Sequence, residues 1–333
     1  MQPARVGSQG ADDGGGARGR RVVAVAVLFP GQGSQYVGMA DPWTEHPAGR
    51  AVLEEASDAL GRDVVEGSRD EQALATTQFV QPALLACDIA AFRVLEAEGM
   101  RAGAAAGHSL GEFAALVAAG VLDLVGAVRL VAVRGRAMQE AADANAGTMT
   151  ALIGAGAADA AELRDAVARD DDVLTVANEN ASNQTVLSGS PSAIERAEAE
   201  AKRRRIRTIR LNVAGAFHSP LMQPAVDPIV ATLASATFSA PAFPLVANVT
   251  GAFVEDPAEL RGLLAMHVVS PVRWEASLRA LAEAGFDTFV EAGPGQVLSK
   301  IVQRDLPGVR ARAVGSPEDA RLFAASGGEQ ARQ

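Results

Sequence analysis

The sequence predicts a doubly wound α/β domain that is interrupted by a small second domain. At both ends of the chain, short apolar runs bounded by glycine and proline alternate with helical patterns, as in parallel sheets covered by helices. Between residues 148 and 214 the pattern changes to strand, helix, strand, strand, helix, strand, which is the ferredoxin-like order. We therefore expect a discontinuous larger domain over 21–147 and 215–318, with the smaller domain inserted at 148–214.

The larger domain is predicted from strands and helices that alternate along the chain. An apolar run at 22–28 ends in a Phe-Pro-Gly-Gln-Gly-Ser-Gln turn, which is typical of a strand buried on both faces of a sheet. Small residues at 102–106 predict a second strand that runs directly into a Gly-His-Ser turn and a helix. The remaining predicted elements are helices at 47–61, 82–98, 112–119 and 123–142, a strand at 286–290, and a helix from 297.

The inserted domain and the two ends of the chain have patterns of their own. Predicted strands cover 148–154, 173–178, 184–189 and 206–213, and predicted helices cover 156–169 and 191–204. Residues 1–20 are polar and rich in glycine, which is typical of a disordered leader. Residues 319–333 are expected to form a loosely ordered tail.

Composition argues against several classes of protein. The net charge of −10 lacks the basic balance of a general nucleic-acid binder. The single cysteine, Cys87, rules out an internal disulfide and a cysteine-based zinc site, and we expect no metal and no bound cofactor. No apolar run reaches about 20 residues, the length of a membrane span, and the polar N-terminus does not resemble a secretory signal. We expect a cytoplasmic monomer with no membrane partner.

Ser109 is the candidate nucleophile, because it lies in Gly-His-Ser-Leu-Gly between a predicted strand and a predicted helix. This is the setting of a nucleophile elbow, in which two glycines allow a tight turn that lifts the hydroxyl out of the sheet. The N-terminus of the following helix stabilises negative charge that develops there. Glycine and serine are common residues, so a purely structural turn is the alternative.

A serine nucleophile needs a base, and the sequence contains four histidines. His108 adjoins the serine, so we expect its side chain to point elsewhere, and His46 precedes a proline at a helix start without other chemical groups. His218 and His267 remain. His218 follows the last strand of the inserted domain, and a loop between two domains often overhangs a cleft. We favour His218 as the base; a hydrogen-bonded loop histidine is the alternative.

Arg134 lies on the apolar face of the helix predicted at 123–142. With about 3.6 residues per turn, this face also contains Leu130 and Met138, whereas Arg129 and Arg136 lie on the opposite side. A guanidinium is seldom buried without an anionic partner. One explanation is a buried ion pair with a glutamate, and the other is a forked clamp for a substrate carboxylate. The clamp would imply an acyl group that ends in a carboxylate.

Several further segments carry distinctive motifs. They are FPGQGSQYVGM at 29–39, QPALL at 81–85, GHSLGEFAAL at 107–116, RLVAVRGRAMQ at 129–139, GAFHSPLM at 215–222, SPVRW at 270–274 and EAGPGQVL at 291–298. Together they resemble one family, the malonyl-CoA:acyl carrier protein transacylases of fatty acid synthesis with the related acyltransferases of polyketide synthases. The resemblance spans 22–316 and implies an α/β-hydrolase-like domain with a ferredoxin-like insert, in agreement with the predicted order of elements.

The resemblance implies roles for residues at the matching positions. Ser109 would carry the acyl group, His218 would be its base, and Arg134 would bind the malonyl carboxylate. The backbone N–H groups of Gln32 and Leu110 would form the oxyanion hole.

No aspartate is implied in the catalytic dyad, because a main-chain carbonyl in the 267–271 loop would orient His218 instead. The family usually has glutamine where this chain has His267, which leaves the role of that side chain open. Polar residues at matching positions are expected along the substrate cleft: Gln81, Asn178, Gln184 and His267.

The resemblance also implies malonyl-CoA and an acyl carrier protein as partners in a ping-pong reaction. Phe217 precedes the base and would narrow the pocket beside the α-carbon, where one methylene is worth about 1–3 kcal/mol; this favours malonyl over substituted malonyl groups. A basic run within the acidic chain, including Arg204, Arg205 and Arg207, would dock an acidic carrier protein. An ordinary solvated helix end is the alternative.

Two other functions compete with acyl transfer. A hydrolase with the same dyad, such as an editing acyl hydrolase, would not need Arg134. A docking module without activity would need neither Ser109 nor His218. The sequence leaves open whether the pathway is fatty acid or polyketide synthesis, where the chain would be a discrete, trans-acting acyltransferase.

Overall fold

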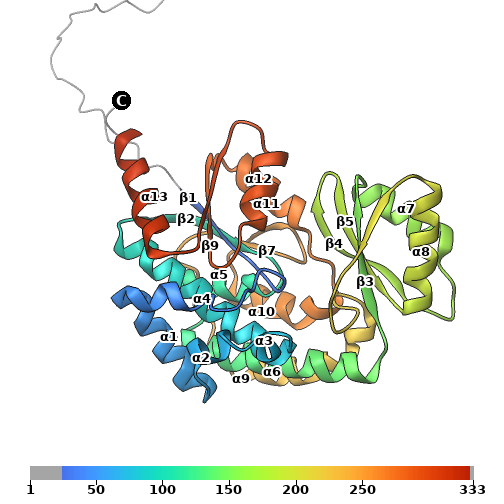
Figure 1. The fold of residues 1–333 in the computed structure, drawn as a ribbon, viewed down its shortest axis with the longest axis horizontal. Coiled ribbons are helices and arrows are strands. Elements are labelled where there is room, and N and C mark those ends of the chain that lie inside the picture. The colour runs from blue at the N-terminus through green and yellow to red at the C-terminus, as the bar shows by residue number, and fades with distance from the viewer. Residues whose placement is uncertain (1–24, 331–333) are drawn as a thin grey trace, which may run out of the picture.

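The computed structural model describes residues 25–330, with side chains to residue 326, so the predicted leader at 1–20 lies outside the described residues. Figure 1 shows two parts beside each other, a larger one around a mostly parallel sheet and a smaller one around an antiparallel sheet. The predicted fold class, a doubly wound domain with an inserted subdomain, is confirmed.

The larger sheet has six strands in the order β10-β9-β1-β2-β7-β8. All neighbours in it are parallel except β7 and β8, which form an antiparallel edge. Its strands are β1 (Val25–Phe29), β2 (Ala102–Gly107), β7 (Leu245–Ala247), β8 (Ala252–Val254), β9 (Thr288–Ala292) and β10 (Arg310–Val314). The inner strands β9, β1, β2 and β7 are largely buried on both faces, as a covered parallel sheet requires, whereas the edge strands β8 and β10 carry exposed residues.

Helices cover both faces of the larger sheet. Alternate residues of β1 show the two sides: Val27 belongs to the core beneath α1, α4, α5 and α6, whereas Leu28 packs with Trp274 and Leu298 from α11 and α12. The helices of this part are α1 (Pro47–Leu60), α2 (Val64–Ser68), α3 (Glu71–Leu74), α4 (Thr77–Ala97), α5 (Gly111–Ala118), α6 (Leu124–Ala144), α9 (Val226–Ser235), α10 (Pro257–Met266), α11 (Trp274–Glu283), α12 (Val297–Asp305) and α13 (Pro317–Gln330), with short 3-10 helices η1 (Asp41–Glu45), η2 (Pro220–Ala225) and η3 (His267–Val269).

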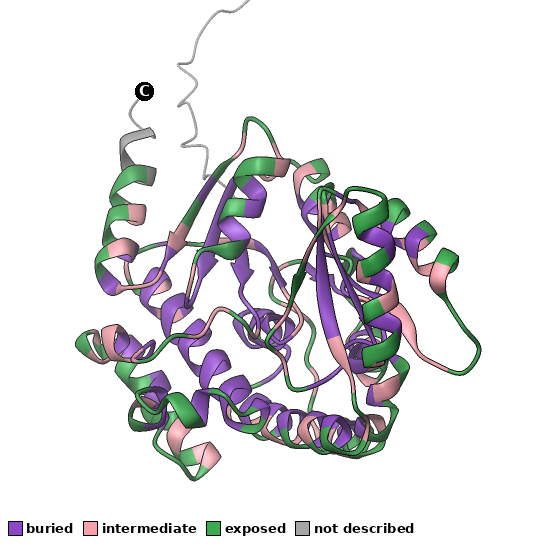
Figure 2. Ribbon diagram, turned by 45° about the vertical axis from the view of Figure 1, so that its right-hand side comes forward, coloured by how far each residue is buried: buried purple, intermediate pink, exposed green. Residues whose placement is uncertain are grey.

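Helix α4 is the central helix of the larger core. Its length and hydropathy would allow it to cross a membrane, although no segment of this kind was expected from the sequence. However, 89% of its most apolar window is buried inside the protein. Figure 2 shows this continuous burial beneath the sheet. We therefore interpret α4 as the core helix of a globular domain.

The smaller part follows the predicted β-α-β-β-α-β order. Its elements are β3 (Thr148–Ile153), α7 (Ala157–Val167), β4 (Leu174–Ala181), β5 (Gln184–Gly189), α8 (Pro191–Arg203) and β6 (Arg207–Arg210). The four strands are antiparallel in the order β4-β5-β3-β6. Both helices pack on one face through a small core that includes Leu152, Leu163 and Ile194. The opposite face of the sheet is left to line a cavity.

The C-terminal segment differs from the prediction. A loosely ordered tail was expected over 319–333. Over 319–330 the chain instead continues α13, and 331–333 lie outside the described residues. The helix is held because Ala320 is fully buried and Phe323 packs against the larger core, while Ser316 and Asp319 hydrogen bond across its first turn. The weak apolar pattern of this segment hides these two anchors.

Candidate active site

Ser109 occupies a sharp turn between β2 and α5. Its φ angle is 50°, in the left-handed region that residues other than glycine seldom adopt. The two flanking glycines are required by close packing, because a side chain at Gly107 would collide with the backbone of Gly111, and one at Gly111 would collide with the carbonyl of Phe29. The turn therefore has the geometry of a nucleophile elbow, as the pentapeptide predicted.

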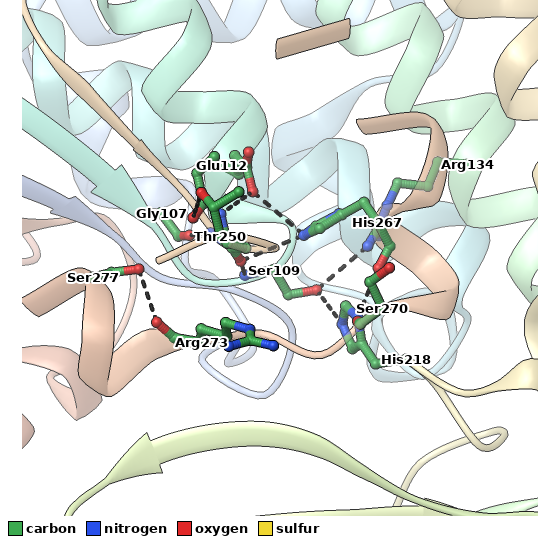
Figure 3. A network of polar contacts seen from close by, with 12 residues as sticks. Gly107, Ser109, Glu112, Arg134, His218, Thr250, His267, Ser270, Arg273 and Ser277 are labelled. Carbon is green, nitrogen blue, oxygen red and sulfur yellow. Dashed lines mark hydrogen bonds and ion pairs between the residues drawn. The ribbon is translucent and has the colours of Figure 1, made fainter. Parts of the chain in front are cut away.

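His218 lies against the serine hydroxyl, with 2.8 Å between His218 Nε2 and Ser109 Oγ (Figure 3). Its other ring nitrogen, Nδ1, is 3.0 Å from the backbone carbonyl oxygens of both His267 and Ser270. A carbonyl can only accept, so Nδ1 carries the hydrogen and Nε2 presents its lone pair to the serine. The dyad is thus assembled in the orientation in which the imidazole can take the hydroxyl proton.

The electrostatic surroundings keep the imidazole of His218 neutral. Burial, followed by the positive charge of Arg134, lowers the pKa of His218 to about 3, although the two carbonyl contacts act in the opposite direction. The residue is only 3% exposed. At neutral pH the base is therefore in the form that accepts a proton.

Arg134 is a buried cation that points at the nucleophile. It is 1% exposed, donates to Gln81 Oε1 at 2.6 Å, and places Nη2 3.3 Å from Ser109 Oγ. Burial lowers the pKa of Arg134 to about 10, so the group stays protonated at neutral pH. Within residues 25–330 no carboxylate forms an ion pair with it, and its Nε has no hydrogen-bond partner. The buried ion pair considered for this residue is therefore absent from the described structure.

A cavity of about 380 Å³ opens in front of the dyad, between the two parts of the molecule. Gln32 and Leu110 line it, and neither backbone N–H has a hydrogen-bond partner among the described residues. Two unclaimed N–H groups beside the nucleophile are what an oxyanion hole needs. The geometry is thus compatible with the role that the resemblance gave these two residues.

The cavity also contains most of the other predicted cleft residues. Gln81, Asn178, Gln184 and Phe217 all line it. Gln81 comes from α4 and bridges Arg134 and Gln32, whose Oε1 is 3.4 Å from Gln81 Nε2. The face of the small sheet completes the wall with uncharged side chains such as Met149, Ala151 and Val186.

His267 does not lie where a substrate contact was expected. Its side chain is 1% exposed, is not part of the cavity wall, and packs behind the dyad with its ring centroid 5.4 Å from that of His218. Only its carbonyl is turned to the base. The expectation of a substrate-binding side chain is therefore wrong, because His267 begins the 3-10 helix η3 and its imidazole is buried in the core.

The two remaining histidines have other partners. His108 lines the cavity but turns away from the serine, with Nε2 2.8 Å from Asn180 Oδ1 and the ring packed edge-on against Trp274. His46 accepts a hydrogen bond from the backbone of Ala48 and so caps α1. Among the described residues, no group of three or more metal-ligating side chains is arranged to hold a metal ion.

The arginines of the predicted docking region differ in whether an acidic side chain pairs with them. Arg204 lies 2.8 Å from Glu200 and Arg210 lies 2.6 Å from Glu198 on α8, so their charges are partly neutralised. Arg205 and Arg207 form no ion pair with any described residue. The alternation of a strand places Arg207 on the same face of β6 as Leu211, which lines the cavity.

Two buried polar residues beside the dyad were not identified from the sequence. Glu112, in the first turn of α5, is 3% exposed, and burial raises its pKa to about 7. Asn248, directly after β7, is fully buried and contacts the elbow. A glutamate in the otherwise apolar helix after the serine was a usable signal, but the three-residue strand before Asn248 is too short to stand out.

Comparisons with known proteins agree with this geometry. Residues 27–323 match the family model "Acyl transferase domain". The malonyl CoA-acyl carrier protein transacylase of Escherichia coli K12 is 40% identical over 299 residues, covering 88% of this chain and 96% of that protein. The Bacillus subtilis enzyme of the same name is 37% identical, covering 90% and 95%.

Solved structures give the same result. The Xanthomonas oryzae malonyl-CoA:acyl carrier protein transacylase has a TM-score of 0.87 at 38% identity, covering 91% of this chain and 98% of that one. A malonyl-transacylase in complex with a type II polyketide synthase acyl-carrier protein has a TM-score of 0.87 at 34% identity, covering 91% and 99%. The chain therefore belongs to the acyl transferase family of malonyl-CoA:acyl carrier protein transacylases.

Proposed function

We propose that this enzyme transfers a malonyl group from coenzyme A to the phosphopantetheine thiol of an acyl carrier protein, through an ester on Ser109. The observation that carries the malonyl assignment is Arg134, a buried cation 3.3 Å from the nucleophile. The charge of Glu112 acts on it, but it forms no ion pair with any carboxylate in the described part of the chain. A buried charge of this kind needs an anion, and the carboxylate of a malonyl group fits a guanidinium fork.

The contacts support a two-step reaction. Ser109 Oγ attacks the thioester carbonyl while its proton passes to His218 Nε2, 2.8 Å away. The backbone N–H groups of Gln32 and Leu110 stabilise the oxyanion, and the thiol of coenzyme A leaves with the proton from His218. The carrier thiol then attacks the ester, gives its proton to His218, and returns the serine to its free form. Thioester and ester are close in energy, so the transfer is reversible.

Phe217 supports malonyl over larger substituted groups. Its side chain lines the cavity directly before the base and is 7% exposed, so little free space remains beside it. An extra methyl or ethyl group on the α-carbon would have to displace this ring, and one methylene is worth about 1–3 kcal/mol in such a pocket.

Arg205 and Arg207 are the proposed contacts for the carrier protein. Both lack an acidic partner within the described residues, and Arg207 is on the cavity side of the small sheet next to the exposed Ile209. An acidic carrier protein with an apolar patch would match this surface. Arg204 contributes less, because Glu200 already holds its guanidinium.

Several expectations from the sequence belong to the same proposal. The enzyme acts as a cytoplasmic monomer without a metal, a bound cofactor or a membrane partner. The acidic net charge of −10 and the burial of α4 support the absence of nucleic-acid and membrane partners. The sequence favours neither fatty acid nor polyketide synthesis strongly, and a discrete, trans-acting polyketide acyltransferase fits as well as a fatty acid enzyme.

Mass spectrometry after incubation with malonyl-CoA tests the proposal. We expect an adduct of malonyl mass on Ser109 that passes to an added carrier protein faster than to water. An acyl-thioester hydrolase with the same dyad would release malonate mainly to water, and that result would overturn the transferase assignment. A pool of acetyl- and methylmalonyl-CoA in the same experiment measures the selectivity for malonyl.

A further inference from the structure

Asn248 holds the nucleophile elbow from behind. It follows β7, the neighbour of β2 in the larger sheet. Its Nδ2 donates to the carbonyl of Gly107 at 2.6 Å, and its Oδ1 accepts from the backbone N–H of Ser109 at 2.7 Å. One fully buried amide thus spans the turn from the residue before His108 to the residue after it.

The two hydrogen bonds from Asn248 stabilise the strained backbone of the elbow. A residue other than glycine in the left-handed region costs on the order of 1 kcal/mol or more and persists only where its surroundings fix it. Two short hydrogen bonds from one side chain fix the backbone on both sides of the turn. They also occupy the N–H of Ser109, whereas the next N–H, that of Leu110, has no partner among the described residues and is open to an oxyanion.

Two buried side chains in turn hold Asn248. Its backbone N–H donates to Glu112 Oε2 at 3.1 Å. His267 Nε2 is 3.4 Å from Asn248 Oδ1 and 3.5 Å from Glu112 Oε2. An amide oxygen can only accept, so the hydrogen of His267 lies on Nε2 in this contact. Figure 3 shows Glu112 and His267 together on the side of Ser109 away from His218.

His267 therefore contacts His218 directly and reaches Ser109 through Asn248, with different atoms in each case. Its carbonyl oxygen accepts from Nδ1 of His218, and its imidazole donates towards the amide that clamps Ser109. The imidazole is buried, and its own Nδ1 has no hydrogen-bond partner among the described residues. Leaving a buried nitrogen without a partner is unfavourable, so packing alone does not account for a histidine here.

We propose that His267 and Asn248 are positioning residues of the acyl transfer, which set the distance and direction between Ser109 and His218. The proposal rests on the proposed function, but it concerns the nucleophile rather than the acyl group. In this arrangement Glu112 anchors Asn248, and the histidine side chain couples the orienting carbonyl to the elbow. Neither residue touches the substrate.

Substitutions at position 267 separate the side chain from the backbone carbonyl, which every variant keeps. Leucine has a similar size but no donor, whereas the amide of glutamine can still donate to Asn248 Oδ1. We expect His267→Leu to lower the single-turnover rate of serine acylation about 10- to 100-fold, because small misplacements of reacting groups have effects of this size. The KM for malonyl-CoA should not change. His267→Gln should restore the rate to within a few-fold of the wild type.

Asn248→Ala should lower the same rate at least as much, again without a change in KM. Asn145→Ala is its matched control, because Asn145 also bonds carbonyl oxygens, those of Ala141 and Leu221, but lies at the end of α6 outside the cavity. The control should change the urea midpoint and not the acylation rate. Equal rates for His267→Leu and wild type, or an equal loss in His267→Leu and His267→Gln, would overturn the proposal.

A fluorophosphonate probe makes the test independent of the malonyl assignment. Ser109 attacks the phosphorus, fluoride leaves, and the serine proton passes to His218, so labelling reports the dyad whatever acyl group the enzyme carries. We expect the order wild type, His267→Gln, His267→Leu in labelling rate. If the wild type labels in this way but takes no malonyl group, the proposed function fails while the positioning proposal stands.

Discussion

The larger domain and the small sheet face the same cavity with different kinds of side chain. Among the described residues, the ionisable groups beside the nucleophile belong to the larger domain: His108, Glu112, Arg134, His218 and His267. The small sheet presents side chains such as Met149 and Val186, none of them charged among those that line the cavity. The difference indicates that the larger domain supplies the groups for proton transfer, whereas the small domain forms the uncharged wall that limits access to the nucleophile.

Loss of the base should have the largest effect, and it belongs to the larger domain. His218→Ala removes the group that accepts the Ser109 proton, so the acylation rate should fall about 10²- to 10⁴-fold. The measurement is the rate of adduct formation with malonyl-CoA. His46→Ala is the control, since His46 caps α1 and faces Glu98, and it does not line the cavity. A rate within a few-fold of the wild type would remove His218 from the mechanism.

Loss of Arg134, the proposed ligand of the malonyl carboxylate, should have the next largest effect. Arg134→Ala removes hydrogen bonds from a charged group, worth about 1.5–3 kcal/mol each, so kcat/KM for malonyl-CoA should fall about 10- to 100-fold. Loading from acetyl-CoA should rise relative to malonyl-CoA, because the buried cation no longer disfavours a neutral group. Arg136→Ala, on the exposed face of the same helix, should change neither rate. Unaltered malonyl loading in Arg134→Ala would break the malonyl assignment.

A change on the small domain should affect the carrier protein alone. Arg207→Glu should raise the KM for the acyl carrier protein about 2- to 5-fold, which corresponds to an exposed ion pair of about 0.2–1 kcal/mol. The KM for malonyl-CoA should stay the same. Arg129→Glu, an equal charge reversal on the exposed face of α6, should leave both constants unchanged. A shift in the malonyl-CoA constant would contradict the division between the two domains.

The smallest effect on activity is expected at Asp88, a residue of the larger core that the reaction does not use. Neither carboxylate oxygen of Asp88 has a hydrogen-bond partner within residues 25–330, and burial followed by the charge of Glu291 raises the pKa of Asp88 well above its ordinary value. The folded protein thus holds a proton that the unfolded chain releases above about pH 4, so this residue lowers stability increasingly as pH rises from there towards its folded pKa.

Asp88→Asn cannot ionise in either state and should remove this part of the pH dependence. The urea midpoint of the variant relative to the wild type should be higher at pH 8 than at pH 5, and acyl transfer should be unchanged. A difference between the two proteins that does not vary with pH would show that Asp88 is ionised in the fold.

The sequence predicted the fold class because its two patterns are strong: apolar runs that end in glycine turns, and the six-element order between 148 and 214. It predicted a buried position for Arg134, because a charged residue on the apolar face of a long helix departs from the helical pattern of apolar residues. It did not predict β10, whose arginines interrupt the apolar run, or β7 and β8, which have only three residues each. Asn248 was missed for the same reason, since its role depends on which strand lies next to β2.

The placement of His267 could not be obtained from the sequence either. Its backbone contact to His218 came from family resemblance, and its side chain was expected in the cleft. Whether a side chain in a 3-10 turn points to the cavity or to the core depends on a few backbone angles that no periodic pattern records. Contacts between loops that are distant in the sequence could be identified only from the folded structure.

Both members of the dyad have positive φ angles, 50° at Ser109 and 56° at His218. Glycine adopts this region without the steric cost that a β-carbon adds. The two positions that the reaction cannot spare are therefore also positions at which the chain would be more relaxed without its side chains. Glycine at Ser109 removes only a small side chain, so the inactive Ser109→Gly variant should survive heating longer than the working enzyme. At His218 the relief would be outweighed, because losing the buried imidazole leaves a cavity and two carbonyl oxygens without their donor.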